Sequence, residues 1–447
     1  MSGIAGIAER DKKKEVQQML DKISHRGRAG SRIIETEGAT LGVVWTEPQS
    51  DAEVLLKEKH IAKDEAGKGQ FAQAEVTDDG VILTRDPIGV APLYYGHTKN
   101  GDLSFASEVK AMLEVTDDVN KLPAGSRYDG KKIESYFQLQ EQSPINDSSD
   151  DVAKELHRRL DQSVRSNIDD GDVGSWLSGG LDSSTMSALA SKYVDKLNTF
   201  AVGLSGSSDV EYAREVADFI GSKHHELIVN TDALLKALPE VIYHLESFDA
   251  LLVRSSITNY MVAKLASDHV PKVFSGEGGD ELFAGYSYLK ELDQSELPGE
   301  LIDITNRLHD TALQRVDRCA SAHGTVAYVG FLDPDVVDYA VRIPIEYKLN
   351  NGVEKWILRK AMDGMLPKRV LDRPKAKFWE GAGVGDILSQ YADEKISDTE
   401  FNSERNLPNG WVINTKEELF YYRIFREIFG DLDNLSWMGR TKGAPKQ

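Results

Sequence analysis

The chain is poor in cysteine, in basic side chains and in long apolar runs. Its 447 residues include one cysteine, Cys319, which cannot form an internal disulfide or hold zinc alone and fits a reducing compartment. Lys and Arg number 53 against 73 Asp and Glu, a net charge of −20 that disfavours phosphate backbones and anionic lipid headgroups. No stretch approaches the roughly 18 uninterrupted apolar residues that cross a bilayer. We therefore expect a cytoplasmic protein that binds neither nucleic acid nor membranes.

Changes of pattern along the chain predict two domains. Short apolar runs between turn signals indicate a β-rich domain over 1–135, with strands at 39–45, 80–84, 92–95 and 103–106. The polar residues of 136–151 predict a linker. Over 152–437, helical stripes alternate with β-like runs, which is typical of a parallel α/β sheet. The remaining residues, 438–447, have no periodicity and predict a frayed tail.

The second domain is expected to begin as strands alternating with helices and to end as mostly helical chain. The predicted strands are Val173–Leu177, Thr199–Leu204, Glu226–Val229 and Lys272–Phe274. The predicted helices include Ser183–Val194, Val210–Ile220, Leu301–Ala322, Lys355–Met365 and Glu417–Ile428.

The strongest local signal is the run SGGLDSS, which follows a predicted strand and precedes a predicted helix. Its glycines allow a tight turn whose N–H groups converge on one anion, and the helix N-terminus adds positive charge. Its serines can donate to phosphate oxygens, and its aspartate is placed for magnesium. An ordinary glycine turn with a helix cap is the alternative. The candidate residues are Leu177, Ser178, Gly179, Gly180, Asp182, Ser183 and Ser184.

A second turn, SGEGGDE at 275–281, follows the fourth predicted strand. Parallel sheets bind ligands beyond the carboxyl ends of their strands, so both turns should face one crevice. Ser275 and Gly276 would then lie against the nucleotide, and Asp280 would share magnesium with Asp182. Glu277 would face the substrate as a general base. The alternative is an acidic surface turn.

These motifs resemble a known family. SGGLDSS at 178–184, TFAVGL at 199–204, SGEGGDE at 275–281 and GFLD at 330–333 are similar to the synthetase domain of glutamine-dependent asparagine synthetases and of the related β-lactam-forming synthetases. The likeness continues through 355–359 and 373–383 and covers nearly all of 150–390. It implies an α/β protein: a degenerate, β-rich domain like N-terminal-nucleophile hydrolases, then an ATP-pyrophosphatase domain, Rossmann-like, with a helical C-terminal part.

The resemblance also implies a reaction that uses ATP and Mg²⁺. A carboxylate attacks the α-phosphate of ATP, pyrophosphate leaves, and an amine attacks the acyl-adenylate to give an amide and AMP. The 178–184 turn would hold pyrophosphate. The other implied roles are magnesium binding by Asp182 and Asp280, adenosine contact by Val202 and Gly203, activation of the nitrogen nucleophile by Glu277, and charge stabilisation by Lys375. Because β-lactam formers carry tyrosine in place of Glu277, intermolecular attack by ammonia is favoured over ring closure.

The first domain departs from the family pattern. Ser2 stands where the family has its catalytic cysteine, and 25–30 lacks the Pro and Asp of the family's Arg-Gly-Pro-Asp turn. The segment that supplies oxyanion-stabilising groups has no counterpart, so hydrolysis would lose a main electrostatic contribution. We therefore expect no glutaminase activity, with nitrogen supplied as free ammonia, by an external ammonia source, or as an amine substrate.

The acceptor pocket departs as well. Leu251 and Leu252 stand where asparagine synthetases usually have two threonines, while Arg254 remains to clamp a carboxylate. Each lost hydroxyl costs an aspartate about 1–3 kcal/mol. The acceptor is therefore either aspartate held differently or a more apolar acid.

The sequence thus predicts an ATP-dependent amide ligase that takes a small carboxylic acid and ammonia. Three alternatives stay open: a ligase joining another acid to ammonia or an amine, a non-catalytic nucleotide-binding regulator, and a hydrolase that uses Ser2. The sequence also leaves open whether the chain forms a homodimer.

Overall fold

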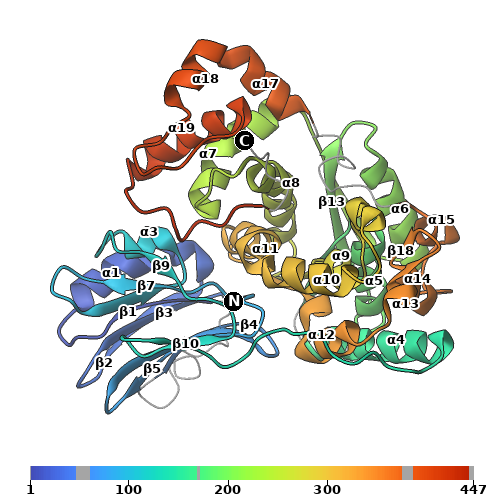
Figure 1. Ribbon diagram of the computed structural model, residues 1–447, viewed down its shortest axis with the longest axis horizontal. Helices are drawn as coiled ribbons and strands as arrows, with labels where there is room; N and C mark the ends of the chain where they lie inside the picture. Colours follow the sequence, from blue (N-terminus) through green and yellow to red (C-terminus); the bar gives the residue numbers. More distant parts are fainter. Residues whose placement is uncertain (1, 47–60, 169–171, 375–385, 442–447) are drawn as a thin grey trace.

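The computed structural model describes residues 2–46, 61–168, 172–374 and 386–441. The N-terminal part is built from two antiparallel sheets, and the rest surrounds one parallel sheet with helices (Figure 1). Two helices of the second part, α8 and α11, lie between its parallel sheet and the N-terminal part. α8 packs on strand β13, and α11 packs on α8. None of the helices in these described ranges is both long and apolar enough to cross a membrane.

The two N-terminal sheets contain six and five strands. Their orders are β2-β3-β1-β8-β7-β9 and β11-β10-β6-β5-β4, with antiparallel neighbours. The bounds are β1 Ser2–Ile7, β2 Gly30–Glu35, β3 Thr40–Trp45, β4 Ile61–Gly67, β5 Gln70–Thr77, β6 Gly80–Arg85, β7 Tyr94–His97, β8 Leu103–Ala106, β9 Asn120–Lys121, β10 Ser126–Tyr128 and β11 Ile133–Ser135.

Alternating side chains hold these sheets face to face. Strand β5 buries Ala72 and Ala74, and the residues between them are half-buried, as the two-residue period of a strand requires. The alanines belong to one apolar cluster with Ile4 of β1 and Phe105 of β8. On the other face of the six-stranded sheet, α1 (Lys13–Lys22) buries one apolar stripe and contacts α3 (Val109–Met112).

The sequence predicts only part of this β structure. Predicted strand 103–106 is β8, and 39–45 and 80–84 differ by one residue from β3 and β6. Predicted strand 92–95 starts too early, because Pro92 has no N–H for a ladder, and β7 begins at Tyr94. Strands β1, β2, β4, β5, β9, β10 and β11 are not predicted. In β4, Asp64 interrupts the apolar pattern but is buried because Arg26 donates to it from another segment.

The parallel sheet has the order β14-β13-β12-β15-β16. The strands are β12 Val173–Trp176, β13 Asn198–Leu204, β14 Lys223–Val229, β15 Lys272–Phe274 and β16 Val326–Tyr328. The four predicted strands are confirmed within three residues, and β16 is added by the structure. Because β13 and β15 lie on opposite sides of β12, the strand order reverses at β12, which is where open α/β sheets bind ligands.

Helices cover this sheet and form the rest of the chain. They are α4 Ser149–Ser166, α5 Leu181–Ala190, α6 Ser208–Ile220, α7 Thr231–Leu245, α8 Ala250–Ser267, α9 Gly279–Leu282, α10 Leu297–Asn306, α11 Ala312–Ser321, α12 Pro334–Val341, α13 Ile345–Lys348, α14 Trp356–Ala361, α15 Lys368–Leu371, α17 Ile387–Lys395, α18 Asp398–Glu404 and α19 Lys416–Phe429. Short elements are η1 Ser24–Arg26, η3 Ser287–Glu291, η4 Leu308–Asp310, η5 Gly330–Leu332, β17 Leu349–Asn350 and β18 Val353–Glu354.

Three helix predictions need correction. The predicted helix Ser183–Val194 has the wrong bounds, because α5 spans Leu181–Ala190. The predicted helix Leu301–Ala322 is wrong as one element. α10 ends at Asn306, the short turn η4 follows, and α11 begins after Thr311, whose φ of −134° and ψ of −97° are not helical. The preceding residue, Asp310, is held by the ammonium of Lys121 at 2.6 Å, a tertiary contact that apolar periodicity does not show. The predicted helix Lys355–Met365 is shortened to α14 at both ends. Lys355 has a left-handed φ of 55°, and at the other end Met362 is not helical and Gly364 has a φ of +76°.

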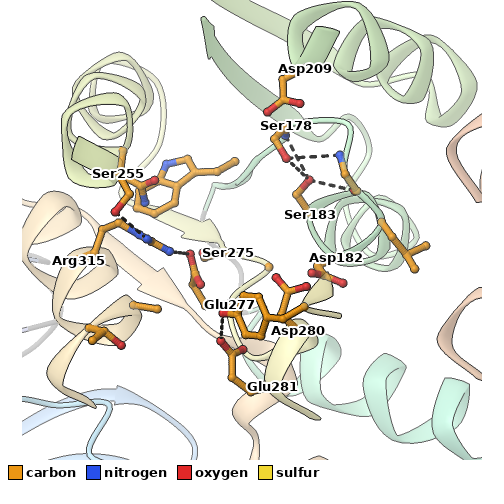
Figure 2. A pocket seen from close by; sticks show the side chains of 18 of the residues that line it. Ser178, Asp182, Ser183, Asp209, Ser255, Ser275, Glu277, Asp280, Glu281 and Arg315 are labelled. Atoms are coloured by element: carbon orange, nitrogen blue, oxygen red, sulfur yellow. Dashed lines mark hydrogen bonds and ion pairs between the residues drawn. The ribbon is translucent and has the colours of Figure 1, made fainter. Parts of the chain in front are cut away.

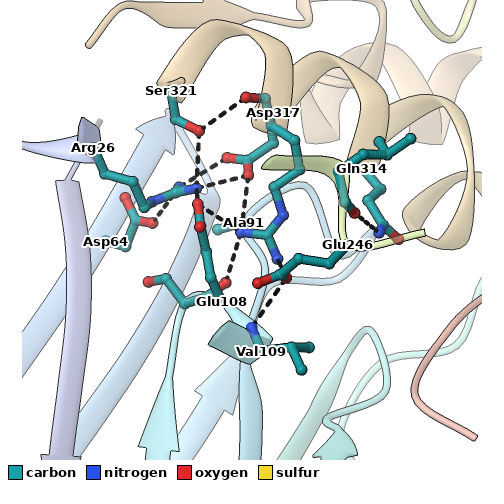
Figure 3. A network of polar contacts seen from close by, with 12 residues as sticks. Arg26, Asp64, Ala91, Glu108, Val109, Glu246, Gln314, Asp317 and Ser321 are labelled. Atoms are coloured by element: carbon teal, nitrogen blue, oxygen red, sulfur yellow. Dashed lines mark hydrogen bonds and ion pairs between the residues drawn. The ribbon is translucent and has the colours of Figure 1, made fainter. Parts of the chain in front are cut away.

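A buried ionic cluster joins the N-terminal part to the rest (Figure 3). Arg26 donates through both terminal nitrogens to Asp317 of α11, at 2.8 and 2.9 Å, and also to Asp64 and Glu108. Arg318 of α11 contacts Glu108 at 2.8 Å. Although burial opposes the charge, the carboxylates raise the pKa of the Arg26 guanidinium well above its usual range. Buried charges are tolerated when they are paired in this way.

The segment that connects the two parts and the C-terminal segment are predicted to be a linker and a frayed tail. Residues 136–148 contain no helix or strand, and α4 begins at Ser149, where the Ser148 side chain caps it. The prediction of a frayed tail is wrong for 438–441. Met438 is buried, Arg440 pairs with Glu418, and the Thr441 N–H donates to Asp249. These long-range partners, rather than local periodicity, hold the segment.

Candidate active site

A cavity of about 420 Å³ lies beyond the carboxyl ends of β12, β13 and β15. Figure 2 shows carboxylates, serines and the guanidinium of Arg315 around it. Its polar lining combines anions and cations from both glycine-rich turns and from four distant segments. These residues include Ser178, Asp182, Ser183, Asp209, Glu277, Asp280, Arg315, Lys355 and Arg373.

The first turn joins β12 to α5 and requires glycine. Gly179 has a φ of +69°, and a Cβ there would lie 2.3 Å from the Cβ of Tyr212. The Ser178 N–H donates to the Ser183 hydroxyl at 3.2 Å, and the two hydroxyls are 3.0 Å apart. The turn is thus held by its own serines at the N-terminus of a ten-residue helix, an arrangement suited to phosphate oxygens.

The second turn packs directly on the first. A Cβ on Gly276 would lie 2.6 Å from the Ser183 nitrogen, and one on Gly279 would lie 2.5 Å from the Asp182 carboxyl carbon. Real Cβ atoms do not approach so closely, so only glycine allows this contact. The structure therefore brings the two predicted turns together.

Lys355 lies between the two predicted magnesium ligands. Its ammonium is 2.5 Å from a carboxylate oxygen of Asp182 and 2.5 Å from one of Asp280. Among the described residues, no group of three or more His, Cys, Asp or Glu is arranged to hold a metal ion. Magnesium is commonly held by one or two carboxylates together with substrate phosphates, so this pair fits a metal that arrives with a nucleotide.

Arg315 of α11 holds Glu277. One terminal nitrogen of its guanidinium donates to Glu277 Oε1 at 2.5 Å, and the other donates to Ser255 Oγ at 2.9 Å. Although burial opposes the charge, Glu277 raises the pKa of Arg315. The guanidinium thus orients this carboxylate in the cavity. The motifs do not predict Arg315, and nothing in the run ALQRVDRCAS distinguishes it from the second arginine of α11, Arg318.

The second turn also carries a buried acid, Glu281. Tyr286 donates to one of its oxygens. Burial, and then the charge of Asp280, raise the pKa of Glu281 to about 7. This carboxyl group is therefore partly protonated at neutral pH, which reduces repulsion among the acids of the turn.

Most predicted nucleotide-binding residues line the cavity, but three do not. Lining residues are Leu177, Ser178, Gly180, Asp182, Ser183, Val202, Ser275 and Gly276. Gly179 and Ser184 support the turn from behind, since Gly179 packs on α6 and Ser184 is fully buried. Gly203 packs on Ser207. Lys375 lies outside the described residues, and Arg373, two residues earlier, reaches the cavity and pairs with Asp209 at 2.6 Å.

Two of the three residues predicted to contact the acceptor line the cavity. Leu251 and Leu252 line the cavity. Arg254, predicted to clamp the acceptor, instead donates two hydrogen bonds to Glu417 of α19 and is not among the described residues that line the cavity. Glu417 lies 163 positions away, so the sequence around Arg254 does not reveal this partner.

The predicted degenerate glutaminase position, Ser2, begins β1. Arg26, from the segment that resembles the family's Arg-Gly-Pro-Asp turn, faces the buried cluster. Its guanidinium thus binds four protein side chains, including Ser321.

Comparison with known proteins agrees with this geometry. The sequence model described as asparagine synthase matches residues 155–306 and 293–442, and one described as glutamine amidotransferase domain matches 44–156. The chain belongs to the asparagine synthase family. It is 35% identical over 416 residues to asparagine synthetase B of Escherichia coli (strain K12), described as glutamine-hydrolyzing, covering 85% of this chain and 74% of that protein. A probable asparagine synthetase of Schizosaccharomyces pombe, also described as glutamine-hydrolyzing, is 35% identical over 425 residues. The match covers 85% of this chain and 76% of that protein.

Among solved structures, NMN synthetase from Francisella tularensis has 12% identity and a TM-score of 0.31, covering 65% of this chain and 98% of that one. A likeness this weak carries no argument. The family matches confirm the predicted family and fold class, a β-rich amidotransferase-type domain followed by an ATP-pyrophosphatase-type α/β domain. The asparagine synthase family member described here is an ATP-dependent ligase that forms carbon–nitrogen bonds.

Proposed function

We propose that the chain is a magnesium-dependent amide ligase that uses ammonia rather than glutamine. It adenylates a carboxylic acid with ATP, releases pyrophosphate, and amidates the acyl-adenylate to give an amide and AMP. The observation that carries the proposal is that the serine-held turn, the Asp182 and Asp280 pair and Glu277 all line one cavity. Each group has a role in that sequence of steps.

The nucleotide would bind with its phosphates on the first turn. Backbone N–H groups and the hydroxyls of Ser178 and Ser183 can donate to phosphate oxygens. Asp182 and Asp280 would hold the magnesium, which neutralises the departing pyrophosphate. Lys355 and Arg373 add positive charge on the same side, which stabilises the charge that develops as the leaving group departs.

Glu277 would remove the proton from the attacking nitrogen. A general base must be oriented toward the proton that it removes, and the Arg315 guanidinium holds the Glu277 carboxylate in place in the cavity. Glutamine is disfavoured as nitrogen source because Ser2 replaces the family's cysteine nucleophile and because Arg26 is engaged by Asp317. Free ammonia, or ammonia from a separate enzyme, is the proposed donor.

The acceptor is proposed to be more apolar than aspartate. Leu251, Leu252, Ile304, Leu308 and Ala312 give the cavity an apolar wall. With Arg254 held by Glu417, the clamp for a second carboxylate is missing from this wall. Aspartate held by other cations of the cavity is the competing acceptor.

The test is release of AMP and pyrophosphate from ATP and Mg²⁺ with aspartate or valerate, each with ammonium or glutamine as nitrogen source. The proposal expects turnover with ammonium and none with glutamine, and faster turnover of valerate than of aspartate. Turnover with glutamine alone would overturn the ammonia assignment. ATP binding without AMP release for either acid would favour a non-catalytic regulator.

A further inference from the structure

A second, smaller cavity of about 150 Å³ adjoins the first. Its walls come from the connecting segment near Leu139, from α9 and α10, and from Val341, Ile343, Pro344, Ile345 and Lys348. Glu281 lines both cavities. The second cavity is thus next to the active site, but the proposed reaction assigns it no role.

Lys348 at the end of α13 is the unusual group in this cavity. The residue is 4% exposed and lines the cavity. In the described part of the chain its ammonium has no hydrogen bond, ion pair or aromatic ring as a partner. A buried ammonium without a partner is costly unless it loses its proton or gains an anion. Burial alone lowers the pKa of Lys348 to about 7.

The rest of the lining is mainly aliphatic and leaves little room for a large ligand. Leu301, Ile302 and Ile343 are among the side chains that form the walls. Two carboxylates also line the cavity. Tyr286 already donates to Glu281, and Glu141 is exposed, so that water screens its charge. Lys348 is therefore the buried charge that a ligand can neutralise.

We propose that this cavity binds a short-chain monocarboxylate, with its carboxylate on the Lys348 ammonium and its hydrocarbon tail against Leu301, Ile302 and Ile343. A cationic ligand is excluded by Lys348, and a phosphate would leave the aliphatic walls uncovered. The bound acid would contact α9, which also carries Asp280. Binding here does not depend on the proposed reaction, so the two can be tested separately.

The test uses the full chain and 4,4,4-trifluorobutyrate, followed by its ¹⁹F resonance, with the corresponding amide as a neutral probe. Lys348→Met removes the charge at similar length, and Ile302→Trp fills the cavity while keeping Lys348. Lys236→Met, which alters an exposed lysine of α7, is the matched control. The expected result is one saturable bound resonance in wild type and in Lys236→Met that both cavity variants weaken at least about tenfold and that the amide does not give. A resonance from acid bound as acceptor in the larger cavity should be unchanged in both cavity variants.

Either of two results would overturn the proposal. One is no saturable binding of trifluorobutyrate to wild type, and the other is that every bound resonance persists unchanged in Lys348→Met and in Ile302→Trp. The second result would place the acid in the larger cavity. Should Lys348→Met fail to fold, Ile302→Trp alone decides, because it leaves the ammonium in place.

Discussion

Arg315 and Asp317 lie two residues apart on α11 and have partners in different parts of the protein. Arg315 holds Glu277 in the active-site cavity, whereas Asp317 accepts two hydrogen bonds from Arg26 of the N-terminal part. One helix therefore connects the buried ionic cluster to the candidate general base. Substitutions in the ionic cluster should therefore lower stability, whereas substitution of Arg315 should lower activity.

We expect Arg26→Met to destabilise the fold. It leaves Asp317, Asp64 and Glu108 with fewer cationic partners inside the protein, and breaking a buried ion pair from one side costs about 3–5 kcal/mol. Urea unfolding measures the loss in free energy. Arg28→Met, at an exposed neighbouring position, should change stability by less than about 0.5 kcal/mol. Equal losses of unfolding free energy in both variants would show that the buried cluster contributes no more to stability than the exposed Arg28 does.

We expect Arg315→Met to lower amide formation about 100-fold, because Glu277 loses the guanidinium that orients it. Acid-dependent exchange of labelled pyrophosphate into ATP, which reports adenylation, should fall far less. Arg315→Lys should restore part of the amide rate, because an ammonium keeps the positive charge but lacks the two planar terminal nitrogens that donate to Ser255 and Glu277. A parallel loss of exchange and amide formation would instead place Arg315 in nucleotide binding.

We expect Asp182→Asn to lower both pyrophosphate exchange and AMP release by at least about 100-fold. The substitution removes one of the two carboxylates proposed for magnesium, so partial recovery at high Mg²⁺ is expected. Asp218→Asn, at an exposed position of α6, serves as the control. Full activity in Asp182→Asn would remove this residue from the metal site.

Exchanging Leu251 for threonine should change acceptor preference. A hydroxyl in the apolar wall offers aspartate a hydrogen bond and leaves an unsatisfied polar group against valerate. The ratio of kcat/KM for aspartate to that for valerate should rise about tenfold. Leu308→Met, which keeps the wall apolar, should leave the ratio nearly unchanged. An unchanged ratio in Leu251→Thr would place the acceptor elsewhere in the cavity.

Lys348→Met should stabilise the protein in a pH-dependent way. Burial lowers the pKa of Lys348 from its usual 10.5 to about 7, so between these values the unfolded chain binds more protons than the folded one. Wild-type stability therefore carries the full penalty below about pH 7, and the penalty falls as the pH rises toward 10.5. The gain from Lys348→Met, followed by urea unfolding, should be largest at pH 7 and smallest near pH 10. A gain independent of pH would mean that Lys348 is not desolvated.

The parts of this protein that sequence predicts are those with local physical causes. The glycine turns at 178–184 and 275–281 are recognisable because strand ends, tight turns and helix starts are specified within a few residues. The four predicted strands follow for a similar reason, since fully buried parallel strands are continuous apolar runs.

The parts that sequence does not predict depend on distant partners. Arg254 has the guanidinium that a carboxylate clamp needs, but this guanidinium forms an ion pair with Glu417. Lys355 is part of a motif, but its position between Asp182 and Asp280 depends on three separate segments. The strand β4 contains a charged residue whose burial depends on Arg26. In each case, tertiary pairing of charge decides the role of the residue.

The ionic cluster also has a consequence for how the protein is made. Arg26 and Asp317 are separated by 291 positions in the chain. At about 5–20 residues per second, the ribosome needs roughly 15–60 s to synthesise the intervening segment. The last strand of the two sheets, β11, ends at Ser135, so for the later part of that interval the completed β-sheets exist without Asp317 and Arg318. Chaperone binding and proteolysis during synthesis should therefore act mainly on this N-terminal part, before α11 emerges to complete it.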